Sequence, residues 1–292
     1  MSETELNVSL LRQLILHFYK GNLNFHIENM NWDWQQAFLD ATVNSNLIQE
    51  YPISGKFVSL FLKKIIQALE PNQEVHDDFY LQLCKSMNYL NKDGFSYRHY
   101  VIGNDTNNII TMKETRNMVV NGTTGLKTWE AALLLSDWAL CNQNKFVNKN
   151  VLELGSGVGF TGITIGKLCN IKSLILTDCH DDVLKTISEN ILINFPYFKQ
   201  DKDKDITFFK AEDKFLGRFK IDIESYKIYV IQTFCARNKD LEVYIASVIR
   251  NEDTFNGFLT KLGEHGIKYL TQLCNKCKTH FDCMTGRGDR GC

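Results

Sequence analysis

The residues best suited to chemistry lie between Val151 and Gly162, where the chain reads VLELGSGVGFTG. An apolar run carrying one acid, Glu153, predicts a strand buried on both faces of a parallel sheet. Gly155 and Gly157 follow at the positions where the backbone must turn sharply and let a ligand approach. Helical periodicity then resumes. This order of strand, turn and helix places a nucleotide-like ligand at the carboxyl end of the strand.

The glycine spacing separates two kinds of ligand. Dinucleotide sites use Gly-x-Gly-x-x-Gly, but position 160 here is Phe. The form Glu153-Leu-Gly-Ser156-Gly instead resembles the first motif of seven-strand S-adenosylmethionine methyltransferases. That resemblance implies that the acid interacts with the amino end of the ligand and that the glycine backbone passes beneath its sugar. No pyrophosphate has to be held at the helix end.

A second acid follows at a suitable distance. Residues 171–177 are predicted to form a second strand that ends in Asp178, about twenty residues past the glycines. In Rossmann-type folds an acid at this place binds the ribose hydroxyls, so Asp178 is the predicted ribose ligand. The alternative is that Asp178 caps the helix expected over residues 182–194.

An aromatic residue opens the helix that precedes the first strand. The segment from Asn121 to Ala132 is rich in glycine and threonine, and Thr128 is suited to cap the helix that starts there. The flat apolar face of Trp129 suits a base or the mouth of a pocket. Ordinary packing of Trp129 against the sheet is an equal alternative.

Several ordered blocks between residues 95 and 268 resemble the eukaryotic elongation factor 2 lysine methyltransferase family. The blocks are Gly122 to Ala132, Val151 to Gly162, Thr177 to His180, Asn190 to Asn194, and Glu242 to Glu252, the last resembling a late strand followed by its helix. The resemblance implies S-adenosylmethionine as methyl donor and a lysine of elongation factor 2 as acceptor. It implies cofactor contacts at Trp129, Gly155, Ser156, Gly157 and Asp178, beside Glu153. No catalytic residue is assigned, because aligning and desolvating the lysine amine does much of the work.

The chain is expected to fold as an α/β protein in three parts. Residues 1–92 carry four apolar stripes at helical spacing, with Leu10, Leu60 and Met87 among their members, and are predicted to be a helical substrate-recognition domain. For each single residue of these stripes, packing in the core of that domain is the favoured explanation. Residues 93–270 are predicted to form a Rossmann-like seven-strand methyltransferase sheet. Residues 271–292 are expected to be a disordered, cysteine-rich tail.

Composition narrows the class of protein. The chain has 292 residues, 44% of them hydrophobic, and a net charge of -1, which gives no general field for nucleic acid or membrane. Its nine cysteines show no paired framework and its first residues are acidic rather than signal-like, so we expect a reduced, cytoplasmic protein. We also expect it to be a monomer. Cys274, Cys277, His280 and Cys283 have zinc-ligand character, but their uniform spacing favours coincidence, and no metal is expected.

The sequence departs from the family where the pocket should be completed. Family members carry an Asp-Trp pair after the third strand and then an acid-bearing strand; here only Glu212 stands near the first, and residues 221–231 are too short to supply the second. An incomplete sheet is therefore predicted, and an unpaired inner edge would be costly.

Three functions stay open: a methyltransferase of elongation factor 2, one with another protein substrate, and a catalytically impaired variant.

Overall fold

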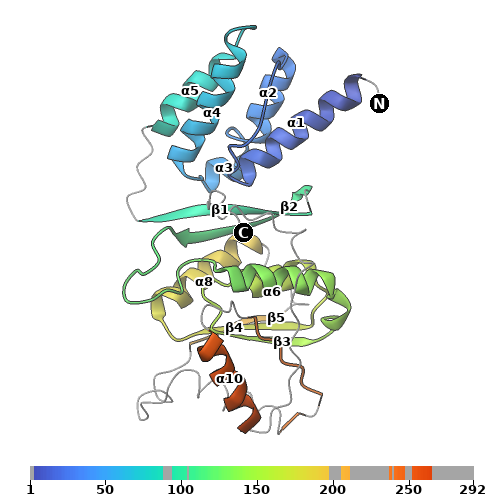
Figure 1. Cartoon of the computed structure of the whole chain (residues 1–292), viewed down its shortest axis with the longest axis vertical. Helices are drawn as coiled ribbons and strands as arrows, with labels where there is room; N and C mark the ends of the chain where they lie inside the picture. Colours follow the sequence, from blue (N-terminus) through green and yellow to red (C-terminus); the bar gives the residue numbers. More distant parts are fainter. Residues whose placement is uncertain are drawn as a thin grey trace. The chain divides into compact units, whose positions relative to one another are not determined.

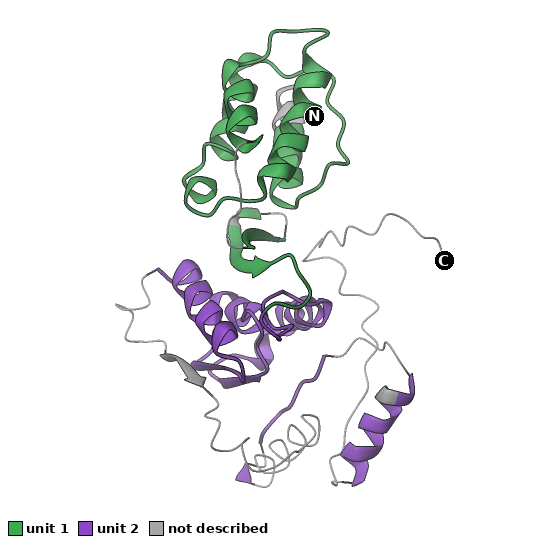
Figure 2. Ribbon diagram, turned by 90° about the vertical axis from the view of Figure 1, so that its left-hand side faces the viewer, with its two compact units in different colours: residues 1–120, 279–292 green, residues 121–278 purple. Residues whose placement is uncertain are grey.

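The computed structural model describes residues 3–87, 94–103, 105–196, 205–210, 237–238, 240–246 and 252–264. Their chain divides into two units, whose described parts lie within residues 1–120 and 121–278 (Figure 2). The first unit combines helices with a β-hairpin, and the second contains a parallel sheet with its helices. The predicted domain boundaries at residues 92 and 270 stay predictions.

Five helices make up the amino-terminal part of the first unit (Figure 1): α1 Glu3–Tyr19, α2 Trp32–Ala41, α3 Asn46–Glu50, α4 Gly55–Leu69 and α5 Asp77–Met87. Polar side chains start three of them, since Asn31, Ser45 and Ser54 accept hydrogen bonds from backbone N–H groups in the first turns of α2, α3 and α4. Apolar periodicity predicts the four longer helices, and the short α3 was missed.

Aromatic rings form the centre of this helical core. Phe38 stacks between Phe61 and Phe79, with ring centroids 6.0 Å apart in each pair, and Phe18 meets Phe61 edge to face at 5.3 Å. These rings come from four helices and are fully buried. Three residues of the predicted stripes are instead exposed on the helix surfaces: Leu10, Leu60 and Met87.

The hairpin pairs β1 Phe95–Ile102 with β2 Asp105–Thr115 in antiparallel fashion. His99 ties it to the helical part of the same unit, because Nδ1 lies 2.9 Å from Thr111 Oγ1 and Nε2 lies 3.0 Å from the Tyr51 carbonyl oxygen. The sequence is polar from residue 103 to 108, but β2 already begins at Asp105. Met118 and Val119, although apolar, are exposed and lie outside the strands.

The second unit has a Rossmann-like core. It contains α6 Glu130–Cys141, a short 3-10 helix Gln143–Lys145, β3 Asn150–Leu154, α7 Phe160–Leu168, β4 Ser173–Asp178, α8 Asp181–Asn194, β5 Asp205–Lys210 and α10 Glu252–Glu264. The described sheet has the order β3-β4-β5, and all three strands are parallel. Helices α7 and α8 connect successive strands, and Figure 1 shows α6 and α8 over one face. This βαβαβ arrangement confirms the predicted α/β class.

The expectation that β3 is buried on both faces is wrong. Leu152 and Leu154 are 42% and 38% exposed, whereas Leu174 and Leu176 of the central strand are fully buried. Among the described residues, β3 has a partner strand on one side only. Leu152 and Leu154 pair with Ile175 and Thr177, so they lie on the opposite face of the sheet from Leu174 and Leu176, which pack against α7.

The buried face of helix α6 matches its apolar pattern only in part. The pattern favours an inner face made of Leu133, Leu134, Leu135, Trp138 and Ala139. Ala139 is fully buried, but Leu134 is 39% exposed, and the buried residues also include Ser136, Asp137 and Leu140. Because residues 131–135 are apolar without interruption, periodicity cannot choose a face there. The helix starts at Glu130 with Trp129 as N-cap residue, so the expected cap at Thr128 is also wrong.

The late part of the predicted sheet is only partly described. Residues 241–246 form neither helix nor strand, although a strand was expected from residue 242, while α10 follows as the expected helix. Glu212, residues 221–231 and the tail at 271–292 lie outside the described residues.

Candidate cofactor site

The turn between β3 and α7 requires glycine. Gly155, Gly157 and Gly159 have φ angles of 68°, 55° and 88°, in the left-handed region that other residues rarely adopt. A Cβ atom on Gly157 would also lie 3.2 Å from the carbonyl oxygen of Gly125. The turn therefore presents bare backbone at the carboxyl end of β3.

Asp178 lies beside this turn because β3 and β4 run parallel and end together. Its Oδ2 accepts the Gly157 N–H at 3.0 Å, and its Oδ1 accepts the Cys179 N–H at 2.8 Å and that of His180 at 3.3 Å. An ionised carboxylate has about four acceptor positions, so this half-buried group can also accept hydroxyl protons. Helix α8 is capped by His180, so the alternative role of Asp178 as its N-cap is excluded.

Ser156 fastens the turn to the neighbouring strand. Its side chain is buried, accepts the Thr177 N–H at 3.1 Å and donates to the Glu153 carbonyl oxygen at 3.2 Å. Its backbone N–H donates to the Thr177 carbonyl oxygen at 2.8 Å. The Ser156 side chain thus serves the frame of the site.

Glu153 holds the start of α7. Its Oε2 accepts the Gly162 N–H at 3.0 Å, and burial raises the pKa of the carboxyl to about 7 against the opposing effect of this bond. The residue as a whole is half-buried, but its carboxylate is enclosed. A Cβ atom at position 162 would lie 2.8 Å from Oε2 and 2.1 Å from Leu176 Cδ2, so only glycine fits there.

A loop of residues 121–129 lies against the glycine turn. The Gly125 carbonyl oxygen faces Gly157, and a Cβ atom on Gly125 would lie 2.8 Å from Val183 Cγ2 of α8. Trp129 closes the loop on itself, since its indole N–H donates to the Thr124 carbonyl oxygen at 2.9 Å. The structure thus brings the loop, the glycine turn and Asp178 together, with Trp129 half-buried at the loop's end.

Three further polar residues support the site and were not predicted. Asn121 and His180 join the loop to the start of α8: His180 Nε2 lies 3.2 Å from the Asn121 carbonyl oxygen. Asn190, fully buried on α8, donates to the Val158 carbonyl oxygen of the glycine turn at 3.0 Å. Asn121 precedes a glycine and has a φ of 51°, so the Asn-Gly pair was the one usable sequence signal.

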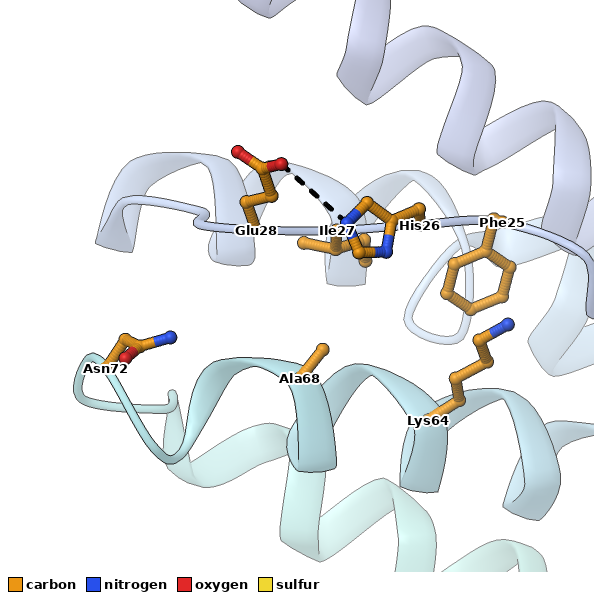
Figure 3. A pocket seen from close by; sticks show the side chains of 7 residues that line it. All are labelled: Phe25, His26, Ile27, Glu28, Lys64, Ala68 and Asn72. Atoms are coloured by element: carbon orange, nitrogen blue, oxygen red, sulfur yellow. Dashed lines mark ion pairs between the residues drawn. The ribbon is translucent and has the colours of Figure 1, made fainter.

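A separate cavity of about 340 Å³ lies in the first unit, between residues 25–28 and α4 (Figure 3). Lys64 Nζ sits 4.6 Å from the centre of the Phe25 ring, and His26 pairs with Glu28 at 3.7 Å on the exposed side. None of the predicted cofactor residues lines this cavity. It is therefore not the predicted cofactor site.

The described part of the chain contains neither a membrane-spanning helix nor a metal-binding cluster. No helix there is both long and apolar enough to cross a bilayer. No group of three or more His, Cys, Asp or Glu side chains in the same part is placed to hold a metal ion. The cysteines of the predicted tail lie outside it.

Comparison with known proteins fits this geometry. Residues 105–217 match a family described as lysine methyltransferase. The human protein-lysine N-methyltransferase EEF2KMT is 29% identical over a span covering 79% of this chain and 77% of its own. The human "Putative protein N-methyltransferase FAM86B2" is 30% identical over the same shares, and the protein-lysine N-methyltransferase EFM3 of Chaetomium thermophilum is 31% identical over 54% of this chain and 52% of its own.

Within the span that it shares with human EEF2KMT, this chain has fewer residues than the alignment has positions. It runs over 262 positions, but 79% of the 292 residues is only about 231 residues of this chain. About 30 positions of the span therefore face gaps in this chain. With this level of identity over most of both proteins, the chain belongs to the protein-lysine methyltransferase family.

Proposed function

We propose that this lysine methyltransferase takes its methyl group from S-adenosylmethionine and transfers it to a lysine of eukaryotic elongation factor 2. The observation that carries the cofactor half is the contact of Asp178 with the backbone of Gly157 at the carboxyl ends of two parallel strands. The names of the relatives and the family resemblance support the substrate half.

The residues present fit the cofactor. The glycine turn presents backbone on which a sugar can lie, and the Asp178 carboxylate stands beside it with about one acceptor position left. Loop 121–129 supplies a wall and the half-buried Trp129 at its end. We assign cofactor contacts to Trp129, Gly155, Gly157 and Asp178, and supporting positions to Glu153 and Ser156.

The bound cofactor would supply an electrophilic methyl group, so the protein must present a neutral lysine amine in line with it. Position and exclusion of water lower the barrier for such a transfer, and effective alignment is worth several kcal/mol. No side chain is assigned as a general base. The enclosed Glu153 carboxylate is engaged with the start of α7, which makes it a frame residue in this proposal.

The helical part of the first unit is our candidate for contact with the protein substrate. It carries the cavity beside Phe25 and Lys64, with the exposed His26 and Glu28 pair at its edge. A monomer in the cytoplasm, where translation takes place, completes the proposal.

Methyl transfer to purified elongation factor 2 tests the proposal directly. Labelled S-adenosylmethionine, the full chain and the purified factor should give label on one lysine, and Asp178→Ala should reduce it. If the factor takes up no label, but another protein does when a cell extract replaces the purified factor, the alternative of a different protein substrate is favoured. The gap in the shared span favours a second candidate, a variant with impaired transfer.

A further inference from the structure

Two side chains at the start of α8 hold Asn121, the first residue of loop 121–129. Asn121 adopts a left-handed backbone, and its side chain Nδ2 donates to Asp182 Oδ2 at 2.9 Å. Its carbonyl oxygen lies 3.2 Å from His180 Nε2. Asn121 thus contacts the beginning of α8 through both its backbone and its side chain.

The second role of His180 selects one tautomer of its neutral ring. As N-cap of α8, the ring accepts the Asp182 N–H through Nδ1 at 3.2 Å, which requires a lone pair on that nitrogen. The proton of a neutral ring then lies on Nε2, where it can donate to the Asn121 carbonyl oxygen. Both contacts are satisfied by one tautomer only.

The consequence of this contact reaches the glycine turn. The same loop contacts Val183 through Gly125, and the Gly125 carbonyl oxygen faces Gly157. His180 also donates its backbone N–H to Asp178 Oδ1 at 3.3 Å. His180 therefore contacts both the loop and the acid of the candidate site.

We propose that Asn121 and His180, the latter as its Nε2–H tautomer, clasp loop 121–129 to the start of α8 and so set the width of the cofactor site. Both are positioning residues, and the proposal rests on the proposed function. Without the clasp, the loop loses its fixed place against Gly157, and ordering it costs part of the binding free energy.

The tautomer can be measured without the cofactor. Long-range proton–nitrogen correlation on the full chain, assigned with a His180→Asn variant, should show a proton on Nε2 and none on Nδ1. A proton on Nδ1 in the neutral ring would overturn the clasp. Hydrogen exchange of residues 121–129 should be faster in His180→Asn than in the unaltered chain.

The His180→Asn variant separates the clasp from the cap. The Asn side chain can still cap α8, but it is too short to keep the bond to Asn121. Loss of one such bond predicts a Kd for S-adenosylmethionine roughly three- to tenfold higher, with kcat retained at saturating cofactor. Lys185→Ala, at an exposed position of the same helix, is the control.

Failure of the clasp and failure of the proposed function give different results. If His180→Asn folds and binds the cofactor as tightly as the unaltered chain, the clasp proposal fails while the proposed function stands. If the unaltered chain binds no S-adenosylmethionine, the proposed function fails, and the tautomer and exchange measurements still decide whether the clasp exists. Asn121→Gly, which keeps the left-handed backbone but loses the bond to Asp182, should show a weaker effect in the same direction.

Discussion

Asp178 Oδ2 accepts the backbone N–H of Gly157 at 3.0 Å, which joins the ends of β4 and the turn after β3. The acid is therefore part of the frame before any ligand arrives. Its contacts with Cys179 and His180 fix the other carboxylate oxygen in the same way. A preformed carboxylate costs less to order on binding, which favours affinity.

Two different replacements of Asp178 should weaken cofactor binding to different extents. Asp178→Ala removes the proposed ribose acceptor and leaves the Gly157 N–H without its partner, so we expect a loss of roughly 1–3 kcal/mol in binding free energy. Asp178→Asn keeps an acceptor oxygen and should lose less. Calorimetry on the folded proteins measures both, and equal affinity of Asp178→Ala and the unaltered chain would refute the ribose assignment.

Gly157→Val should abolish cofactor binding. Its φ of 55° strains a β-branched residue, and the added Cβ would lie 3.2 Å from the Gly125 carbonyl oxygen. Gly103→Val is the matched control, because it has a φ of 61° with nothing within 4 Å of its Cβ position. Retained binding by Gly157→Val would mean that the turn does not face the cofactor.

The sequence predicted the part of the site that rests on local pattern. The glycine turn, the strand ending in Asp178 and the helix after it lie in register along the chain, so short-range rules were sufficient. The contacts of His180 and Asn190 were missed because their partners are backbone carbonyl groups of distant segments. Backbone acceptors are the same at every residue and leave no trace in the sequence.

Burial was the weaker part of the prediction. Leu152 has the same character as Leu174, but Leu174 pairs with Val151 and Leu152 pairs with Ile175, so the two leucines point to opposite faces of the sheet. Helix α7 covers the face of Leu174, where Gly166 lies against its side chain. Which face a helix covers is decided by the whole fold, so similar side chains can differ in burial.

The packing of α7 on β4 should be sensitive to one glycine. Gly162→Ala places a methyl group 2.1 Å from Leu176 Cδ2, so we expect a loss of about 1–3 kcal/mol in unfolding free energy despite the better helix propensity of Ala. Gly166→Ala, in the same helix, meets its nearest side-chain atoms at 3.2 and 3.3 Å and should be nearly neutral. Urea denaturation compares the two, and similar losses would show that α7 shifts freely.

His99 should make the first unit sensitive to acid. Burial lowers the pKa of its ring to about 4, so the folded chain holds it neutral while the unfolded chain, with an ordinary value near 6.5, takes up a proton. Stability is therefore complete above about pH 6.5 and falls as the pH drops towards 4, by up to about 3 kcal/mol. The His99→Gln variant should lack this slope in denaturation curves.

Two comparisons isolate the His99 effect. Glu153 has a raised pKa, so its ionisation costs stability with the opposite sign as the pH rises through about 4.5 to 7, and only the difference between the unaltered chain and His99→Gln is diagnostic. His26→Gln is the control, since the His26 side chain is 85% exposed. An equal slope in His99→Gln would show that another group is responsible.

The gap in the shared span leads to the last prediction, which concerns the activity of this particular chain. The described structure keeps the half of the site from Trp129 through Asp178, and about 30 positions of the span shared with human EEF2KMT have no counterpart here. We place most of these positions after β5, where the family's Asp-Trp pair and acid-bearing strand are expected. Small misplacements of reacting groups cost about 10²-fold in rate. We therefore expect this chain to bind S-adenosylmethionine but to methylate elongation factor 2 at least about tenfold more slowly than a relative with the complete segment. A radiolabel assay of both proteins at equal concentration decides it, with calorimetry confirming cofactor binding; comparable turnover by the two proteins would refute the prediction.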